Sequence, residues 1–143
     1  MTPEEKVTYM YKLNYMQFLF KKYGNNALKD IEEYENNRMK EIWNNIGRNT
    51  KRSIKELCDH LWNKMGDEFE YQVVKETESF VEIKCTKCPF NEIAKENNMK
   101  EIVFSAFCMS DYGIVEGFNN KMKFERTKTL VEGHECCNHK YYL

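Results

Sequence analysis

The spacing of hydrophobic residues changes once along the chain, close to Gly66, and this change constrains the fold more than any other feature. Before Gly66 the clearest apolar stripe has helical spacing, with members at i, i+3, i+4, i+7, i+8 and i+11: Ile54, Leu57, Cys58, Leu61, Trp62 and Met65. From Phe69 onward apolar and polar residues alternate, as they do in a half-buried strand. We therefore expect a helical region over residues 1–66 and an α+β region over residues 67–143.

Start and stop signals divide the N-terminal region into three helices. The sequence Thr2-Pro3-Glu4-Glu5 has the pattern of a capping box with proline at the first helical position, and Gly24 would end that helix. A second helix is expected from about Ala27 to Asn45. It is mostly polar, and the residues expected to be buried are Leu28, Ile31, Ile42 and Ile46. The third helix carries the stripe described above and would end at Gly66.

The C-terminal region reads as two strand pairs with helices between them. Alternation over 69–73 and again over 81–85, with a polar turn at 76–79, predicts a hairpin. Pro89 would begin a short helix that ends at Asn97-Asn98, and a longer helix is expected from Lys100 to Glu116. Two more strands follow, over 122–130 and 136–141. The predicted fold is α+β, an antiparallel sheet of two hairpin-like strand pairs with helices packed on it, in a single domain of residues 1–143.

Composition argues against two classes of partner. The chain has 22 basic and 23 acidic residues, a net charge of −1, and a nucleic-acid-binding domain would usually be basic. No apolar run approaches the ~20 residues needed to span a bilayer, and the start MTPEEKV lacks the basic-then-apolar pattern of a signal peptide. We therefore expect a cytoplasmic protein that binds neither nucleic acid nor membrane. The oligomeric state is left open.

Two charged residues fall in otherwise apolar rows. Asp111 lies on a helical stripe shared with Phe104, Cys108, Val115 and Phe118. Arg126 shares its strand phase with Met122 and Phe124. A buried charge is costly unless it is paired or hydrogen-bonded, so Asp111 and Arg126 are expected to pair with each other. Both a purely structural ion pair and a catalytic role fit this pattern.

The chain has six cysteines, which would remain reduced in the cytosol. Cys58 lies within an apolar helical stripe, which favours a packing role. Cys108 precedes Asp111 by three residues, and Cys137 and His139 point to one face of a strand, with His134 in the preceding turn. A cysteine, a histidine and an acid are the components of an activated thiol nucleophile.

A zinc site is the competing interpretation of the same residues. Cys85 and Cys88 have the spacing of a zinc knuckle, and the C-terminal segment offers four more candidate ligands: His134, Cys136, Cys137 and His139. However, Cys85 continues the apolar phase of its strand, and Cys136 and Cys137 point to opposite faces. A single CxxC is also a weak signal. We therefore expect no bound metal and no cofactor.

Three cysteine-containing motifs occur in order and together resemble a known family. They are Lys87-Cys88-Pro89-Phe90, then Phe107-Cys108-Met109-Ser110-Asp111-Tyr112 with Gly117-Phe118-Asn119, then Phe124-Glu125-Arg126-Thr127-Lys128-Thr129-Leu130 with Gly133 and Cys137-Asn138-His139-Lys140-Tyr141. Over residues 69–143 the chain is similar to bacterial L-2-amino-thiazoline-4-carboxylic acid (ATC) hydrolase-like proteins. It departs from the family pattern at His134 and Asn138, where aspartate is expected, and Cys85 and Cys136 are additional cysteines.

The resemblance implies a hydrolase that opens the 2-amino-thiazoline ring of a small carboxylate to give N-carbamoyl-cysteine or a related product. It implies Cys108 as the nucleophile and Asp111 as its orienting or acid/base partner, with Cys137 and His139 lining the same pocket. Arg126 would bind the substrate carboxylate with its planar guanidinium, and Cys88 and His134 would add further substrate contacts. The alternatives are a non-catalytic small-ligand-binding or regulatory domain of the same fold, or a zinc-stabilised module.

Overall fold

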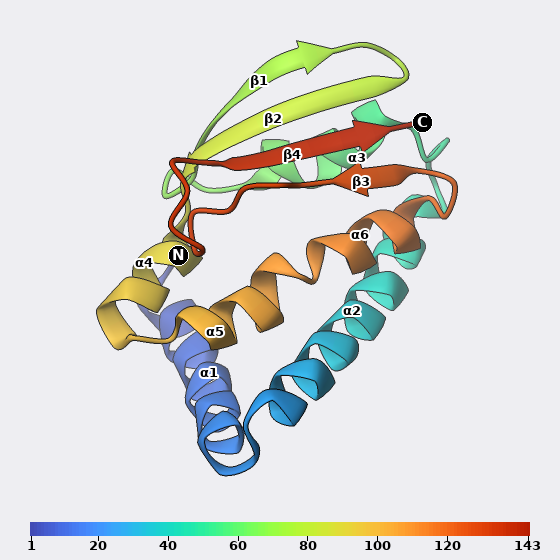
Figure 1. Ribbon diagram of the computed structural model, residues 1–143. Coiled ribbons are helices and arrows are strands. Elements are labelled where there is room, and N and C mark those ends of the chain that lie inside the picture. The colour runs from blue at the N-terminus through green and yellow to red at the C-terminus, as the bar shows by residue number, and fades with distance from the viewer.

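A computed structural model describes all residues, 1–143, and confirms the α+β class. Figure 1 shows the sheet across the top and most of the helices below it. The elements are α1 Pro3–Tyr23, α2 Asn25–Gly47, α3 Ile54–His60, β1 Glu70–Glu76, β2 Phe80–Lys87, α4 Pro89–Asn97, α5 Lys100–Val103, α6 Asp111–Phe118, β3 Lys123–Glu125 and β4 Cys137–Tyr142. No helix combines the length and the apolar character needed to cross a membrane.

The predicted helix signals in the N-terminal region are largely confirmed. Thr2 and Glu5 form the capping box of α1, and Gly24 ends this helix with a positive φ of 68°. One expectation for α2 is wrong, because Ile42 is 38% exposed while Trp43 is buried. The third helix is also shorter than expected. It ends at His60, and a 3₁₀ turn, Trp62–Lys64, follows.

The sheet is antiparallel with the strand order β1-β2-β4-β3. The hairpin predicted around residues 76–79 is present as β1 and β2. In the centre of the sheet Cys85 of β2 pairs with Cys137 of β4, and Ile83 pairs with His139. Side chains two residues apart share a face, so Cys85 and Ile83 lie on one face together with Cys137 and His139. That face is covered by the helices.

The strand predicted over 122–130 is wrong beyond Glu125, where β3 ends. Two side-chain interactions account for the change. The Arg126 guanidinium turns to the helices and binds the carbonyl oxygen of Cys108. The side-chain oxygen of Asn138 then accepts hydrogen bonds from the backbone N–H groups of Thr127 and Lys128, which replaces ladder pairing with a side-chain contact.

The helix predicted from Lys100 to Glu116 is also not continuous. A π-helical turn, Phe104–Cys108, separates α5 from α6, and the N–H of Met109 donates to the carbonyl of Phe104. The chain then turns at Met109 and Ser110, where the Ser110 hydroxyl donates to the carbonyl of Phe107 at 2.7 Å. Single π turns inside helices are frequent at functional sites, and this one contains Cys108.

Two hydrophobic cores meet beneath the sheet. The first lies between the sheet and the helices α2, α3 and α6, and includes Trp43, Leu57, Trp62, Ile83 and Phe118. The second lies between α1, α2, α4 and α5, and includes Leu13, Ile31, Ile93, Ile102 and Val103. The candidate site lies where these two cores adjoin.

Candidate active site

A cavity of about 250 Å³ is lined by residues from both cores. Trp62, Cys85 and Ile114 contribute from the first core, and Phe90 and Phe107 from the second. Six of the seven residues predicted from the sequence also line it: Cys88, Cys108, Asp111, Arg126, Cys137 and His139. The fold thus brings together polar groups that are up to 51 positions apart in the sequence, inside a predominantly apolar wall.

Asp111 and Arg126 form an ion pair in this cavity. The distance from Arg126 Nη1 to Asp111 Oδ2 is 2.5 Å, and the same nitrogen lies 2.6 Å from the carbonyl oxygen of Cys108. The Arg126 side chain is only 3% exposed, and its guanidinium lies 5.8 Å from the ring centres of both Tyr112 and Phe124. Arg126 is therefore internal and paired, as its strand phase predicted. Its charge is already balanced before any ligand binds.

Burial shifts the pKa values of Asp111 and His139 in opposite directions. The pKa of Asp111 is raised to about 6 because burial disfavours the carboxylate, although Arg126 opposes this effect. The pKa of His139 is lowered to about 3 because burial disfavours the imidazolium, and Arg126 adds to this effect. At neutral pH Asp111 is therefore an anion close to its titration range, and His139 is neutral.

Three buried polar atoms of cavity residues have no hydrogen-bond partner, and one of them, Glu35 Oε1, is in an ion pair with Lys12. The other two are His139 Nδ1, which lies 3.8 Å from Asp111 Oδ2, and Arg126 Nε. The His139 ring packs edge-on against Trp62, with 4.8 Å between ring centres, so it is held in place without a hydrogen bond. Buried polar groups in native proteins are nearly always paired. These two atoms are therefore candidates for contact with a bound molecule.

Four cysteines line the cavity, and their environments differ. Burial raises the pKa of Cys85 to about 12 and that of Cys88 to about 11, and it holds the pKa of Cys108 well above its usual range. Burial also raises the pKa of Cys137, but two contacts offset this effect. The N–H of Leu130 donates to its sulfur at 3.2 Å, and Arg126 contributes positive charge. Cys137 is thus the thiol best placed to ionise, where the sequence favoured Cys108.

The remaining cysteines and His134 lie outside the cavity. Cys58 packs against the first core, and burial raises its pKa to about 12. The expected substrate contact by His134 is not supported by its position, because this residue is exposed in the turn before β4. Its Nδ1 lies 3.2 Å from the backbone nitrogen of Thr129. His134 therefore stabilises the turn that replaced the predicted strand. No three His, Cys, Asp or Glu side chains are arranged to hold a metal ion.

Two charged residues of the cavity were not predicted from the sequence. Glu35 and Arg38 come from α2, and Glu35 is fully buried. Arg38 Nη2 and Nε lie 3.0 and 3.2 Å from Glu35 Oε2. The sequence signal is only the i, i+3 spacing of opposite charges on a polar helix, which usually marks a solvated face. The burial of Glu35 depends on the approach of α1, which no local sequence pattern predicts.

Comparison with known proteins places this chain in a family. The model of the L-2-amino-thiazoline-4-carboxylic acid hydrolase family matches residues 15–141. The chain belongs to this family. The match covers every cavity residue except Tyr9 and supports an ATC hydrolase-like function at the family level. No curated protein and no solved structure matches the chain.

Proposed function

We propose that this ATC hydrolase family member opens the ring of a small 2-amino-thiazoline carboxylate with water, giving N-carbamoyl-cysteine or a closely related product. The observation that carries the proposal is Asp111. It is a half-buried carboxylate with a pKa of about 6, held by Arg126 in a cavity that also contains thiols. A group with a pKa near the working pH can both accept and donate a proton during one catalytic cycle. A cavity of about 250 Å³ suits a single small ring.

In the proposed reaction Asp111 accepts the thiol proton of Cys137 as the sulfur attacks the ring carbon between nitrogen and sulfur. The bond from that carbon to the ring sulfur then breaks, and Asp111 returns the proton to the departing sulfur. This leaves an isothiourea linked to Cys137. Water attacks the same carbon, the bond to Cys137 breaks, and the carbamoyl product leaves with the enzyme thiol restored. The sum is one substrate and one water consumed for one ring-opened product.

The other cavity groups have supporting roles in this proposal. Arg126 keeps Asp111 ionised at neutral pH and orients it through the contact at 2.5 Å. The neutral imidazole of His139 offers its unpaired Nδ1 to the substrate amino group or to the attacking water. Cys108, whose carbonyl oxygen is bound to Arg126, shapes the wall next to Asp111. The apolar walls exclude bulk water, which strengthens these electrostatic interactions.

The experiment uses the fact that ring opening creates a free thiol in the product. L-2-Amino-thiazoline-4-carboxylate is incubated with the protein, the protein is removed, and new thiol is measured with a colorimetric thiol reagent. We expect turnover by the parent and by Cys58→Ser, which alters a thiol outside the cavity. We expect at least a ~100-fold loss in Cys137→Ser and in Asp111→Asn, the lower range for losing a general acid-base group.

The same series separates the two cysteine assignments. Turnover that persists in Cys137→Ser and disappears in Cys108→Ser would transfer the nucleophile to Cys108, as the sequence favoured. Mass spectrometry of the quenched parent protein should then show the substrate-derived adduct on the cysteine that reacts. Binding without any turnover by the parent would contradict the proposed function and favour the non-catalytic ligand-binding alternative.

A further inference from the structure

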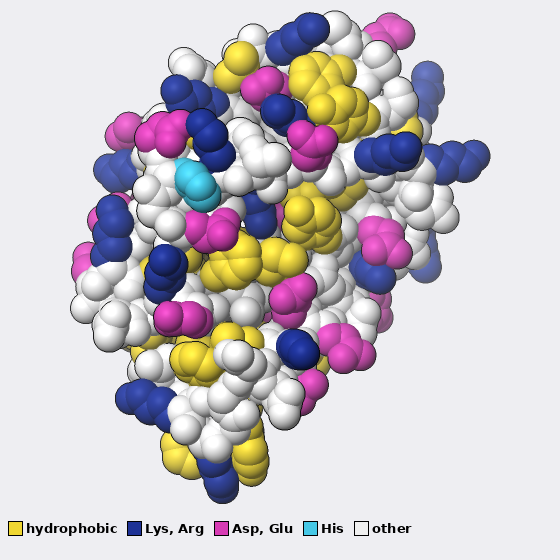
Figure 2. Space-filling model, viewed as in Figure 1, with side chains coloured by type: hydrophobic (Ala, Val, Ile, Leu, Met, Phe, Trp, Pro, Cys, Tyr) yellow, Lys and Arg dark blue, Asp and Glu magenta, His cyan; other side chains and the backbone are white.

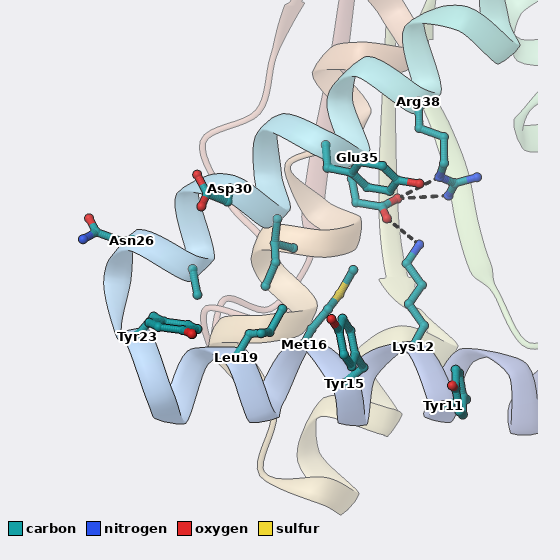
Figure 3. Close-up of a pocket in the computed structure, with 13 residues that line it drawn as sticks. Tyr11, Lys12, Tyr15, Met16, Leu19, Tyr23, Asn26, Asp30, Glu35 and Arg38 are labelled. Carbon is teal, nitrogen blue, oxygen red and sulfur yellow. Dashed lines mark hydrogen bonds and ion pairs between the residues drawn. The ribbon is translucent and has the colours of Figure 1, made fainter.

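A charged cluster at the edge of the cavity has one more positive than negative charge. Glu35 lies between Lys12 of α1 and Arg38 of α2, as Figure 3 shows. Lys12 Nζ is 2.7 Å from Glu35 Oε1, and Arg38 Nη2 is 3.0 Å from Glu35 Oε2. One carboxylate cannot balance two cations, so the cluster retains a net charge of about +1. Asp111 and Arg126 form a balanced pair in the same cavity.

Arg38 has unused hydrogen-bonding capacity that Arg126 lacks. Its Nε and Nη2 both donate to Glu35, but its Nη1 has no partner in the protein. The Arg38 side chain is 39% exposed, against 3% for Arg126. A planar guanidinium that is fixed on one edge and free on the other is suited to bind a carboxylate.

Arg38 lies where the cavity meets a second depression. A groove of about 950 Å³ runs between α1 and α2, and its walls include Tyr11, Tyr15 and Tyr34. Glu35 and Arg38 line both the groove and the cavity. Figure 2 shows hydrophobic side chains at the surface around the junction of α1 and α2. Most residues that line the groove are hydrophobic, so an anion bound to Arg38 would face apolar surface on the groove side, where its attraction to the guanidinium is stronger than in water.

We propose that Arg38, and not Arg126, binds the carboxylate of the substrate, and that Glu35 and Lys12 position it. This inference rests on the proposed function for the identity of the ligand. The ring would then lie in the cavity next to Asp111, with its carboxylate directed to α2. Glu35 is a positioning residue, because it holds two guanidinium nitrogens and leaves Nη1 free. Lys12 offsets the cost of burying the Glu35 charge.

The experiment measures binding with two probes that cannot undergo the proposed ring opening because they lack the reactive amidine carbon. The probes are thiazolidine-4-carboxylate and thiazolidine, which differ by the carboxylate alone, and affinities are measured by calorimetry. We expect the parent to prefer the carboxylate by about 10- to 100-fold, the range for a charge-assisted hydrogen bond. Arg38→Gln should lose this preference and bind thiazolidine with unchanged affinity. Arg48→Gln, a change at an exposed arginine, is the matched control and should keep the preference.

Two further variants test the same assignment. Arg38→Lys keeps the charge but not the planar fork, so it should bind the carboxylate with an intermediate preference. If Arg38→Gln fails to fold, the intermediate value in Arg38→Lys carries the test. Glu35→Gln raises the net charge of the cluster to about +2 but removes the contact that fixes Arg38, so a weaker carboxylate preference is expected because the orientation of Arg38 decides it. An unchanged preference in the folded Arg38 variants, or none in the parent, would overturn the assignment. This experiment measures binding, so its result does not depend on whether the parent shows turnover. The turnover assay alone decides the proposed function.

Discussion

Asp111 and His139 share one buried environment that favours the neutral form of each. For His139 the pKa in the folded protein is about 3 instead of 6.5, so the unfolded chain takes up a proton first as the pH falls. Stability is therefore lost as the pH falls from about 6.5 to about 3. For Asp111 the pKa in the folded protein is about 6 instead of 3.8, so its effect on stability changes with pH in the opposite direction. Its contribution is fully present below about 3.8 and is lost as the pH rises through about 6. The two effects oppose each other between about 4 and 6.

His139→Gln removes one of these two effects and should make the protein less sensitive to acid. Its free energy of unfolding should fall less than that of the parent between pH 6.5 and pH 4, because no buried imidazole resists protonation. Urea unfolding curves at several pH values in this range measure the difference. Curves for the parent and the variant that shift in parallel with pH would show that His139 is not held neutral in the folded state.

The Asp111–Arg126 pair makes a second residue-scale prediction. Arg126→Ala leaves Asp111 buried beside an apolar wall without its counter-charge, and it should lower the free energy of unfolding by ~3–5 kcal/mol. The matched control is Lys55→Ala, which breaks the exposed pair with Asp59 and should leave the denaturation midpoint almost unchanged. Equal denaturation midpoints for the two variants would mean that the Asp111–Arg126 pair contributes no more than a surface contact.

At the scale of elements, the position of Asp111 depends on how closely α6 approaches α2. A methyl group at Gly113 would lie 2.5 Å from the carbonyl oxygen of Asn36, and one at Gly117 would lie 2.4 Å from that of Lys40. Both contacts are with the backbone of α2, which cannot rotate away. The two glycines, four residues apart on one face of α6, therefore permit a helix contact that larger residues would prevent.

Gly113→Ala tests this contact, because the sign of its effect on stability depends on how closely α6 approaches α2. In an exposed helix interior the change from glycine to alanine stabilises by about 1 kcal/mol. Here we expect destabilisation, together with reduced turnover, because α6 must move away from α2 and take Asp111 with it. Thermal unfolding and the thiol-release assay measure the two effects. Glu116→Ala, which removes an exposed pair with Lys40 between the same helices, is the control and should change both little. A stabilised Gly113→Ala protein would contradict the close approach.

The elements that could be predicted from the sequence are those with local causes. The capping box at Thr2, the stop at Gly24 and the alternating hairpin each depend on residues within a few positions of one another, and all are present. The failures depend on distant partners. β3 ends at Glu125 because the next side chain, Arg126, binds the helices, and the π turn before Met109 interrupts a sequence with ordinary helical spacing.

The candidate site was predictable to a similar extent. A charge or thiol in an apolar row marks a buried polar group, and this pattern identified Asp111, Arg126 and Cys108, all of which line the cavity. Glu35 and Arg38 lie on a polar helix, where charged residues usually face water, so the same pattern could not distinguish them from solvent-exposed residues. His134 was grouped with the site because it is close in sequence, but the turn carries its side chain to the surface.

At the scale of the whole molecule, the cavity is the place where the two hydrophobic cores come into contact. Phe90 and Phe107 of the second core stack with 4.1 Å between ring centres and line the cavity opposite Trp62 and His139. None of the buried residues of the second core belongs to a strand of the sheet. A molecule bound between the cores would therefore add contacts to both and couple their stabilities.

This arrangement predicts that ligand binding protects both halves of the protein against local opening. At a hundred times its dissociation constant, a ligand specific for the folded state stabilises it by about 2.7 kcal/mol. With thiazolidine-4-carboxylate as the probe, amide hydrogen exchange should slow in β4 and α6 and also in α4 and α5. The second effect is expected because opening of the second core would expose the bound probe to water. Trp43→Phe, a change in the first core away from the cavity, is the control and should leave the pattern of protection unchanged. Protection confined to β4 and α6 would show that the two cores open independently and that the cavity does not couple them.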